Sequence, residues 1–199
     1  MAYGCRTRVA YCLAADHGLE CPHGPCHCPE PDCEFLDSPP ELRDHLIRRH
    51  DWLVTTISLD KVHLLEMQAM ERRRLLAAEN RGEEHLFLLV ASERAGERVV
   101  RVVCIRTSAR AGPWRYWCKV WSIPPVDTGN GGRNPVLMME DWARSCAVLS
   151  EEAAVDMGGR YLTVAPDDMQ PGGSLRLRVR IEKYRRGPNV GAAAAYPPL

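Results

Sequence analysis

The sharpest alternation of hydrophobic and polar positions lies near the carboxyl end of the chain, between Leu175 and Glu182. Aliphatic residues alternate one by one with charged residues there, as the letters LRLRVRIE show. A period of two places the two sets of side chains on opposite faces of a β-strand. The segment therefore predicts a strand with one face in a hydrophobic core and the other face in water.

Further short runs of β-branched, aliphatic and aromatic residues predict the remaining strands. They are LVTTISLD after Trp52, LFLLVA at 86–91, RVVRVVCIR at 98–106, WRYWCKVWSI at 114–123, and one bent strand or two at 138–149. Clusters of turn-forming residues separate these runs. About seven short strands with such punctuation indicate an antiparallel sandwich. We expect this all-β domain to cover residues 51–185, and the uncharged end of the chain within 186–199 to be a disordered tail.

The charge balance argues against a general nucleic-acid-binding surface. The formal net charge of the 199 residues is zero, and residues 1–50 carry five Lys/Arg against eight Asp/Glu. Binding to a phosphate backbone needs a basic face, so a nucleic-acid partner is not expected. No apolar run approaches the roughly 20 residues that span a bilayer, so we expect no membrane association. The length suits a small module followed by one medium-sized domain.

Cysteine and histidine are concentrated at the amino end of the chain. Six of the nine cysteines lie in the first 33 residues, and five of the seven histidines lie in the first 50. Cysteine mixed with histidine at short intervals indicates metal binding rather than disulfides. It also indicates a reducing compartment, the cytoplasm or the nucleus. The stretch VAYCLAA after Arg8 only faintly resembles a signal peptide because it is short and holds a cysteine, so secretion is not expected.

The strongest candidate for chemistry is a zinc site with four protein ligands, which are Cys26, Cys33, His45 and His50. Six residues separate the two cysteines, eleven lead to the first histidine, and four more lead to the second. Two thiolates and two imidazoles suit a closed tetrahedral zinc site with a structural role. Cys28 lies inside the same loop and is a rival ligand.

Local sequence predicts how this site is built. The letters PEPD between the two cysteines form turns, so the cysteines should lie at either end of a tight loop. Pro39 and Pro40 are suited to the first turn of a helix, which would carry both histidines. If this module is a separate joint, Cys33→Ser should unfold residues 26–50 and leave the strands after Trp52 largely folded.

A related but incomplete pattern precedes this site. Cys5 is followed by eleven residues and His17, and three more residues lead to Cys21. These residues match the ligands of a second zinc site, but the repeat would place its fourth ligand before Met1. Three explanations stay open: the chain begins too late, the module is degenerate and holds no metal, or Cys12 is the fourth ligand. Without a fourth ligand, residues 1–21 should be poorly ordered.

The tandem spacing resembles the zinc fingers of the seven-in-absentia-like family, most closely its plant branch. The letters CHCPEPDC look like its second finger, and YGC with DHGLEC looks like the end of its first. The resemblance implies a small, irregular α+β zinc-finger region over residues 1–50, followed by an antiparallel TRAF-like β-sandwich. In that family a RING recruits a ubiquitin-conjugating enzyme, while the fingers and the sandwich bind protein substrates and dimerise.

No RING precedes Cys5 in this sequence. The resemblance therefore implies the substrate-binding and dimerisation part of a ubiquitin-protein ligase, a homodimer or heterodimer with structural zinc and no ligase activity of its own. It also bears on residues 61–80, where strong helix formers at helical spacing favour a helix. Since a TRAF-like sandwich needs strands there, we expect strands near 62–68 and 73–78.

The expected sandwich offers little sign of catalysis. Cys104, Cys118 and Cys146 lie in apolar strand patterns and are most simply buried hydrophobic residues. Trp117 and Trp121 fall on the face opposite to the other hydrophobic positions of their strand. Either this strand is buried on both sides, or the two tryptophans form an exposed patch suited to a protein interface.

Overall fold

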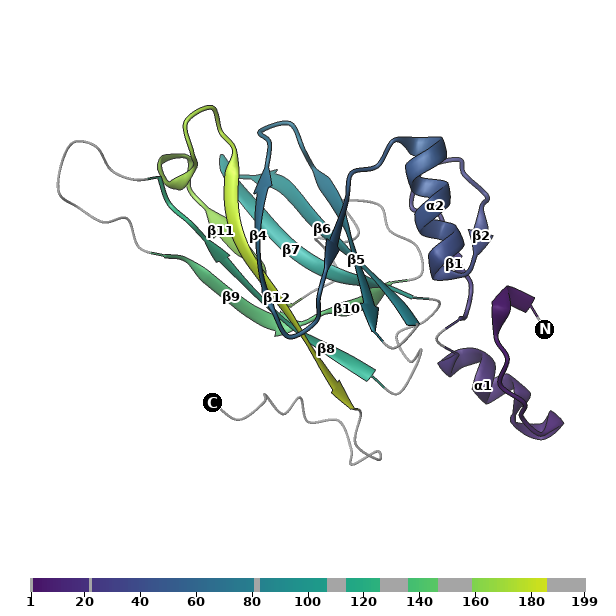
Figure 1. The fold of residues 1–199 in the computed structure, drawn as a ribbon. Helices are drawn as coiled ribbons and strands as arrows, with labels where there is room; N and C mark the ends of the chain where they lie inside the picture. Colours follow the sequence, from purple (N-terminus) through teal and green to yellow (C-terminus); the bar gives the residue numbers. More distant parts are fainter. Residues whose placement is uncertain are drawn as a thin grey trace.

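Two β-sheets form the larger part of the protein (Figure 1). The computed structural model describes residues 2–21, 23–80, 83–106, 114–125, 136–146 and 159–185. The expected tail at 186–199 and the last three residues, 147–149, of the strand region expected at 138–149 lie outside these residues. Within the described ranges the chain is mostly β-structure with few helices, as the hydrophobic pattern predicts.

The first sheet has the strand order β10-β7-β6-β5-β3, with β11 also paired to β7. Its strands are β3 (Val54–Ile57), β5 (Arg73–Asn80), β6 (Glu83–Arg94), β7 (Glu97–Ile105), β10 (Arg144–Cys146) and β11 (Leu162–Val164). The second sheet has the order β4-β12-β8-β9. Its strands are β4 (Val62–Met67), β8 (Trp114–Ser122), β9 (Met138–Trp142) and β12 (Leu175–Arg185). The pairs β3–β5 and β7–β10 are parallel, so the expectation of a purely antiparallel arrangement is wrong.

The smaller, amino-terminal part contains short helices and one small hairpin. Its elements are the 3-10 helices at Ala2–Gly4 and Tyr11–Leu13, helix α1 (Ala14–Glu20), strands β1 (Cys26–His27) and β2 (Leu36–Asp37), and helix α2 (Pro39–His50). A further 3-10 turn lies at Pro166–Asp168. No helix of the described residues is long and apolar enough to cross a bilayer.

Residues 61–80 form two strands, as expected from the resemblance and against the helix propensity of the local sequence. Strand β4 pairs with β12, and β5 pairs with β6 over eight residue pairs. Leu65 and Met67 point into the core, whereas Leu64 is 67% exposed. Side-chain packing and cross-strand pairing override propensity here, because the alternate positions of β4 fit a half-buried sheet.

The two sheets pack face to face around one hydrophobic core. This core contains Leu76, Phe87 and Val100 from the first sheet, and Tyr116 and Val179 from the second. The aliphatic positions of the alternating segment in β12 are all buried, as its period of two predicts, and Glu182 after them is buried as well. Cys104 and Cys118 are also buried in this core, as the sequence suggested.

Helix α2 lies against the outer face of the first sheet (Figure 1), and a second hydrophobic cluster fills the contact between them. Leu42 and Leu46 of α2 have no exposed surface and belong to the same cluster as Leu75, Leu88 and other residues of β5, β6 and β7. Trp52, at the junction, is 7% exposed and packs there too. The amino-terminal module and the sheets therefore share a core, which argues against the module being a separately folding joint.

Trp117 lies on the outer face of the second sheet and is only 2% exposed. Its ring meets Trp142 edge-to-face at 5.0 Å between centroids, and Trp142 in turn contacts Tyr184. The guanidinium of Arg115 lies 4.3 Å from the centre of the Trp142 ring. Trp121 is half-buried. Strand β8 is therefore covered on both sides at Trp117, which favours packing over an exposed tryptophan patch.

A buried polar contact links the two sheets at one end of the core. Nδ1 of His85 on β6 lies 3.0 Å from the hydroxyl of Tyr116 on β8, and its Nε2 lies 3.2 Å from Nζ of Lys183 on β12. Burial, together with the positive charges of Lys183 and Arg106, lowers the pKa of His85 to about 3. The folded protein therefore holds this imidazole neutral.

The His85 pKa gives a testable pH dependence. Below about pH 6.5 the unfolded chain binds a proton at His85 and the folded chain does not. The contribution of neutral His85 to the free energy of unfolding is therefore fully present above that pH and is lost as the pH is lowered. The loss is about 1.4 kcal/mol per pH unit, or about 2 kcal/mol from pH 7 to pH 5. Urea unfolding at both pH values should show a smaller loss in His85→Gln, and an equal loss in both proteins would contradict the assignment.

Candidate metal centres

The more complete of two Cys/His groups is built by a hairpin and the helix that follows it. Strands β1 and β2 pair antiparallel, and beyond their last pair the amide of Cys28 donates to the carbonyl of Phe35 at 2.9 Å. Asp32 takes the left-handed conformation in the connecting loop, with φ of 61°. The amide of Cys33 donates to the carbonyl of Glu30 at 3.3 Å and closes the turn. A tight loop is present as expected, but the cysteines at its ends are Cys28 and Cys33 rather than Cys26 and Cys33.

Helix α2 carries both histidines toward that loop. It begins with two prolines, as the sequence predicted, and ends at His50. Asp51 then takes the left-handed conformation with φ of 52°, and the amide of Trp52 donates to the carbonyl of Leu46 at 3.2 Å. Five positions from His45 to His50 correspond to about 1.4 turns of an ideal helix, so helix periodicity alone does not place the two rings together. His50 is the last residue of α2, and its Nε2 nevertheless lies close to that of His45.

The group consists of four side chains whose donor atoms all lie within 4.8 Å of one another, namely Cys28, Cys33, His45 and His50. Sγ of Cys33 lies 3.3 Å from Nε2 of His45, and Sγ of Cys28 lies 3.5 Å from Nε2 of His50. The two Nε2 atoms are 3.1 Å apart. Metal–ligand bonds of about 2.0–2.3 Å in a tetrahedron put neighbouring donors roughly 3.3–3.8 Å apart, so the four atoms can hold one metal ion.

Cys26, which the sequence spacing favoured as a ligand, is not a member of this group; Cys28 takes its place. Cys26 lies within the hairpin, paired with Asp37, whereas Cys28 lies beyond the last pair at the loop end, nearer to Cys33. The side chain of Cys26 is 1% exposed, and its sulfur lies 3.7 Å from the carbonyl of Gly24. The loop between the two grouped cysteines therefore holds four residues rather than six.

The surroundings favour a cation bound to neutral imidazoles and thiolates. Burial, followed by the neighbouring Cys33, raises the pKa of Cys28 to about 11, so its thiolate is costly without a nearby cation. Burial and the charges of His50 and Arg49 lower the pKa of His45, which keeps its ring neutral. The ring of Phe35 stacks on His45 with centroids 3.9 Å apart and an interplanar angle of 2°, which fixes the orientation of the imidazole.

The second group joins the three residues expected from the incomplete pattern, Cys5, His17 and Cys21. Sγ of Cys5 lies 3.3 Å from Nε2 of His17 on α1. The contact with His17, followed by the backbone of Thr7, lowers the pKa of Cys5 to about 7. Cys12 is exposed and is not part of this group, which leaves the group with three ligands among the described residues.

Glu30 connects the ligand loop to the first sheet and was expected only to form a turn. Its carboxylate accepts a 2.5 Å hydrogen bond from the indole of Trp52 and a second of the same length from the guanidinium of Arg73. That guanidinium also lies 4.4 Å from the centre of the Trp52 ring. The acidic side chain in the loop, the aromatic residue after α2 and the cation on β5 thus fix the ligand loop against the sheet.

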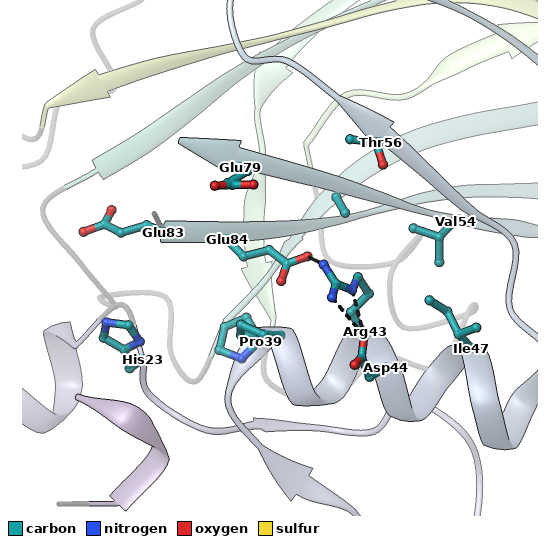
Figure 2. A pocket seen from close by; sticks show the side chains of 12 residues that line it. His23, Pro39, Arg43, Asp44, Ile47, Val54, Thr56, Glu79, Glu83 and Glu84 are labelled. Carbon is teal, nitrogen blue, oxygen red and sulfur yellow. Dashed lines mark hydrogen bonds and ion pairs between the residues drawn. The ribbon is translucent and has the colours of Figure 1, made fainter. Parts of the chain in front are cut away.

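A groove of about 630 Å³ separates α2 from the edge of the first sheet. Figure 2 shows the side chains that line it, which come from α2, β3, β5, the start of β6 and His23 in the segment before β1. Within it, Nη1 of Arg43 forms an ion pair with Oε1 of Glu84 at 2.6 Å, joining α2 to β6. Arg43 also pairs with Asp44 at 2.9 Å.

Comparison with known proteins does not assign the chain to a family. No protein-family model matches its sequence, and no curated protein matches it either. The chemistry of the site therefore rests on the two Cys/His groups themselves, which could each hold a metal ion and whose ligand types are compatible with zinc.

Proposed function

We propose that the chain is a zinc-stabilised, partner-binding module of the seven-in-absentia-like kind. In this proposal the sandwich is TRAF-like, residues 1–50 are the finger region, and residues 51–185 bind protein substrates and dimerise. The module would serve ubiquitin-dependent degradation, with the ubiquitin-conjugating enzyme recruited by a RING outside these 199 residues. One observation carries the proposal: a four-ligand Cys/His group joins the hairpin loop to α2, which packs on the outer face of the first sheet beside a groove.

The role of zinc in this proposal is structural. Cys28, Cys33, His45 and His50 would fill all four positions of a tetrahedral ion, which leaves no position for a substrate or a reactive water. When bound, zinc would supply cross-linking energy to a hairpin of only two residue pairs and to one helix. The ligand loop, fixed by Glu30, would then hold one wall of the groove at a constant distance from the other.

The proposal predicts a dimer without ligase activity of its own. Light scattering after size-exclusion chromatography should give twice the mass of one chain, and a monomer at high concentration would contradict the dimerisation part. With activating enzyme, conjugating enzyme, ubiquitin and ATP, the isolated chain should not become modified. Addition of a RING-bearing ligase of the same family should yield a mixed dimer, whereas self-modification of the isolated chain would overturn the adaptor role.

A nucleic-acid-binding protein is the alternative class, and retention on DNA or RNA tests it. The finger region is net acidic, so we expect no retention at physiological ionic strength. Binding that weakens steeply with added salt would favour the alternative over a protein-binding module.

A further inference from the structure

The groove between α2 and the first sheet has one aliphatic wall and one acidic end. Ile47 of α2, which is 41% exposed, and Val54 of β3 face the groove at one end, whereas Pro39 and His23 lie toward the opposite end, as Figure 2 shows. Glu79 at the end of β5 and Glu83 and Glu84 at the start of β6 stand at the other end, as Figure 2 shows. The groove thus offers apolar contact and negative charge to the same ligand.

Carboxylates outnumber cations in the lining. Four carboxylates face the groove, from Asp44, Glu79, Glu83 and Glu84, whereas Arg43 is the single Lys or Arg among the lining residues. Arg43 is already shared between Asp44 and Glu84.

The partners of the acidic end leave one carboxylate available. The carboxylate of Glu83 lies 3.7 Å from Nζ of Lys183, which approaches it from β12. Glu79 is exposed and has no ion-pair partner in the part of the chain that the structure describes. A cation entering the groove could pair with Glu79 and with the half-exposed carboxylate of Glu83.

Resting on the proposed partner-binding role, we infer that this groove binds an extended segment of a partner protein that carries lysine or arginine side chains. Apolar side chains of the extended segment would lie along Ile47 and Val54, while the charged head of a lysine or arginine reaches the acidic end. An arginine fork matches a carboxylate with two parallel hydrogen bonds, which suits an exposed glutamate. A volume of about 630 Å³ is within the usual range of roughly 300–1,000 Å³ for ligand sites.

A pair of peptides tests the charge requirement directly. The probe is a fluorescein-labelled hexapeptide, Ala-Lys-Ala-Arg-Ala-Lys, and its partner has the same length with acetyl-lysine and citrulline in place of the charged residues. Fluorescence anisotropy with the zinc-loaded full chain should show saturable binding of the charged peptide that weakens as salt increases. Absence of saturable binding up to millimolar protein, or equal binding of both peptides, would overturn the inference.

Matched variants locate the binding to the groove. Glu79→Lys should weaken binding of the charged peptide about tenfold. Glu97→Lys makes the same change in charge at the start of β7, next to the far end of β6, and should leave the affinity within twofold of wild type. Thr56→Arg, on the groove face of β3, is a second variant that fills the groove with a cation and should also weaken binding. Equal losses in Glu79→Lys and Glu97→Lys would show a non-specific charge effect and overturn the assignment.

The peptide measurement uses neither ubiquitin nor the dimer mass as its readout. A monomeric chain that binds the charged peptide in the groove would therefore contradict the dimerisation part of the proposed function while supporting this inference. A dimer that shows no preference for the charged peptide would support the dimerisation part and contradict this inference.

Discussion

Cys28→Ser should abolish zinc retention by the hairpin and α2, whereas Cys26→Ser should leave it intact. The sulfur of Cys28 lies 3.5 Å from Nε2 of His50, within a group of four donors, and Cys26 is outside that group. Removing a thiolate takes away one of the four bonds to the ion. Since loss of a mere hydrogen-bond partner of a ligand costs about 10–100-fold in metal affinity, we expect more than about 100-fold for Cys28→Ser.

The measurement is zinc content by elemental analysis, followed by competition with a chromophoric chelator. Both variants are best compared in a His17→Ala background, so that the group of Cys5, His17 and Cys21 does not contribute zinc. Because Cys26 is buried, Cys26→Ser will lower stability somewhat, but the folded fraction should keep one zinc per chain. Retention by Cys28→Ser together with loss in Cys26→Ser would restore the ligand set that spacing alone favoured.

This test concerns the one position at which spacing and structure disagree. The sequence contains three cysteines in eight residues, Cys26, Cys28 and Cys33, and either of the first two gives an acceptable interval to the third. The hairpin decides between them, because its pairs include Cys26 and His27 and end before Cys28. A two-residue strand has no periodicity from which this register could be read in advance.

The strands of the two large sheets were easier to predict, because only a longer strand carries a recognisable periodic pattern. Strand β12 runs for eleven residues, and its aliphatic side chains are buried at alternate positions, so its period of two is unambiguous. Strand β11 is only three residues long and was not anticipated. The strands at 62–67 and 73–80 followed from the resemblance, since propensity alone favoured a helix there.

The contacts between the module and the sheet could not be predicted from the pattern. Glu30 was recognisable as a turn residue, but its bonds to Trp52 and Arg73 depend on how the ligand loop lies against β5. In the same way, Leu42 and Leu46 were hydrophobic positions of a short helix without an evident partner. Long-range packing of this kind gives no local periodic signal, and it is what makes the metal group part of the larger fold.

The shared cluster predicts that zinc removal destabilises the sheets together with the finger region. Leu46 has no exposed surface and packs with Leu88 and other residues of the first sheet. If α2 leaves after chelation, the outer face of that sheet and the indole of Trp52 become exposed to water. Far-UV circular dichroism and tryptophan fluorescence should therefore give coincident thermal transitions, both at lower temperature after zinc is removed.

A pair of neighbouring residues on α2 measures the same coupling without chelation. Leu46→Ala should cost about 2–5 kcal/mol, as is usual for a fully buried leucine, and at roughly 2–4 °C per kcal/mol the transition should fall by about 4–20 °C. Ile47→Ala, one position along and 41% exposed, is the matched control and should cost far less. A Leu46→Ala protein in which the finger region melts early while the β-sheet signal keeps the wild-type midpoint would contradict a common core.

A single lowered transition would instead mean that α2 is held by the sheet as much as by zinc, because the cluster is made of side chains from both. In that case the four-ligand group sets the position of α2, and the cluster beneath it transmits the loss of that position to the strands.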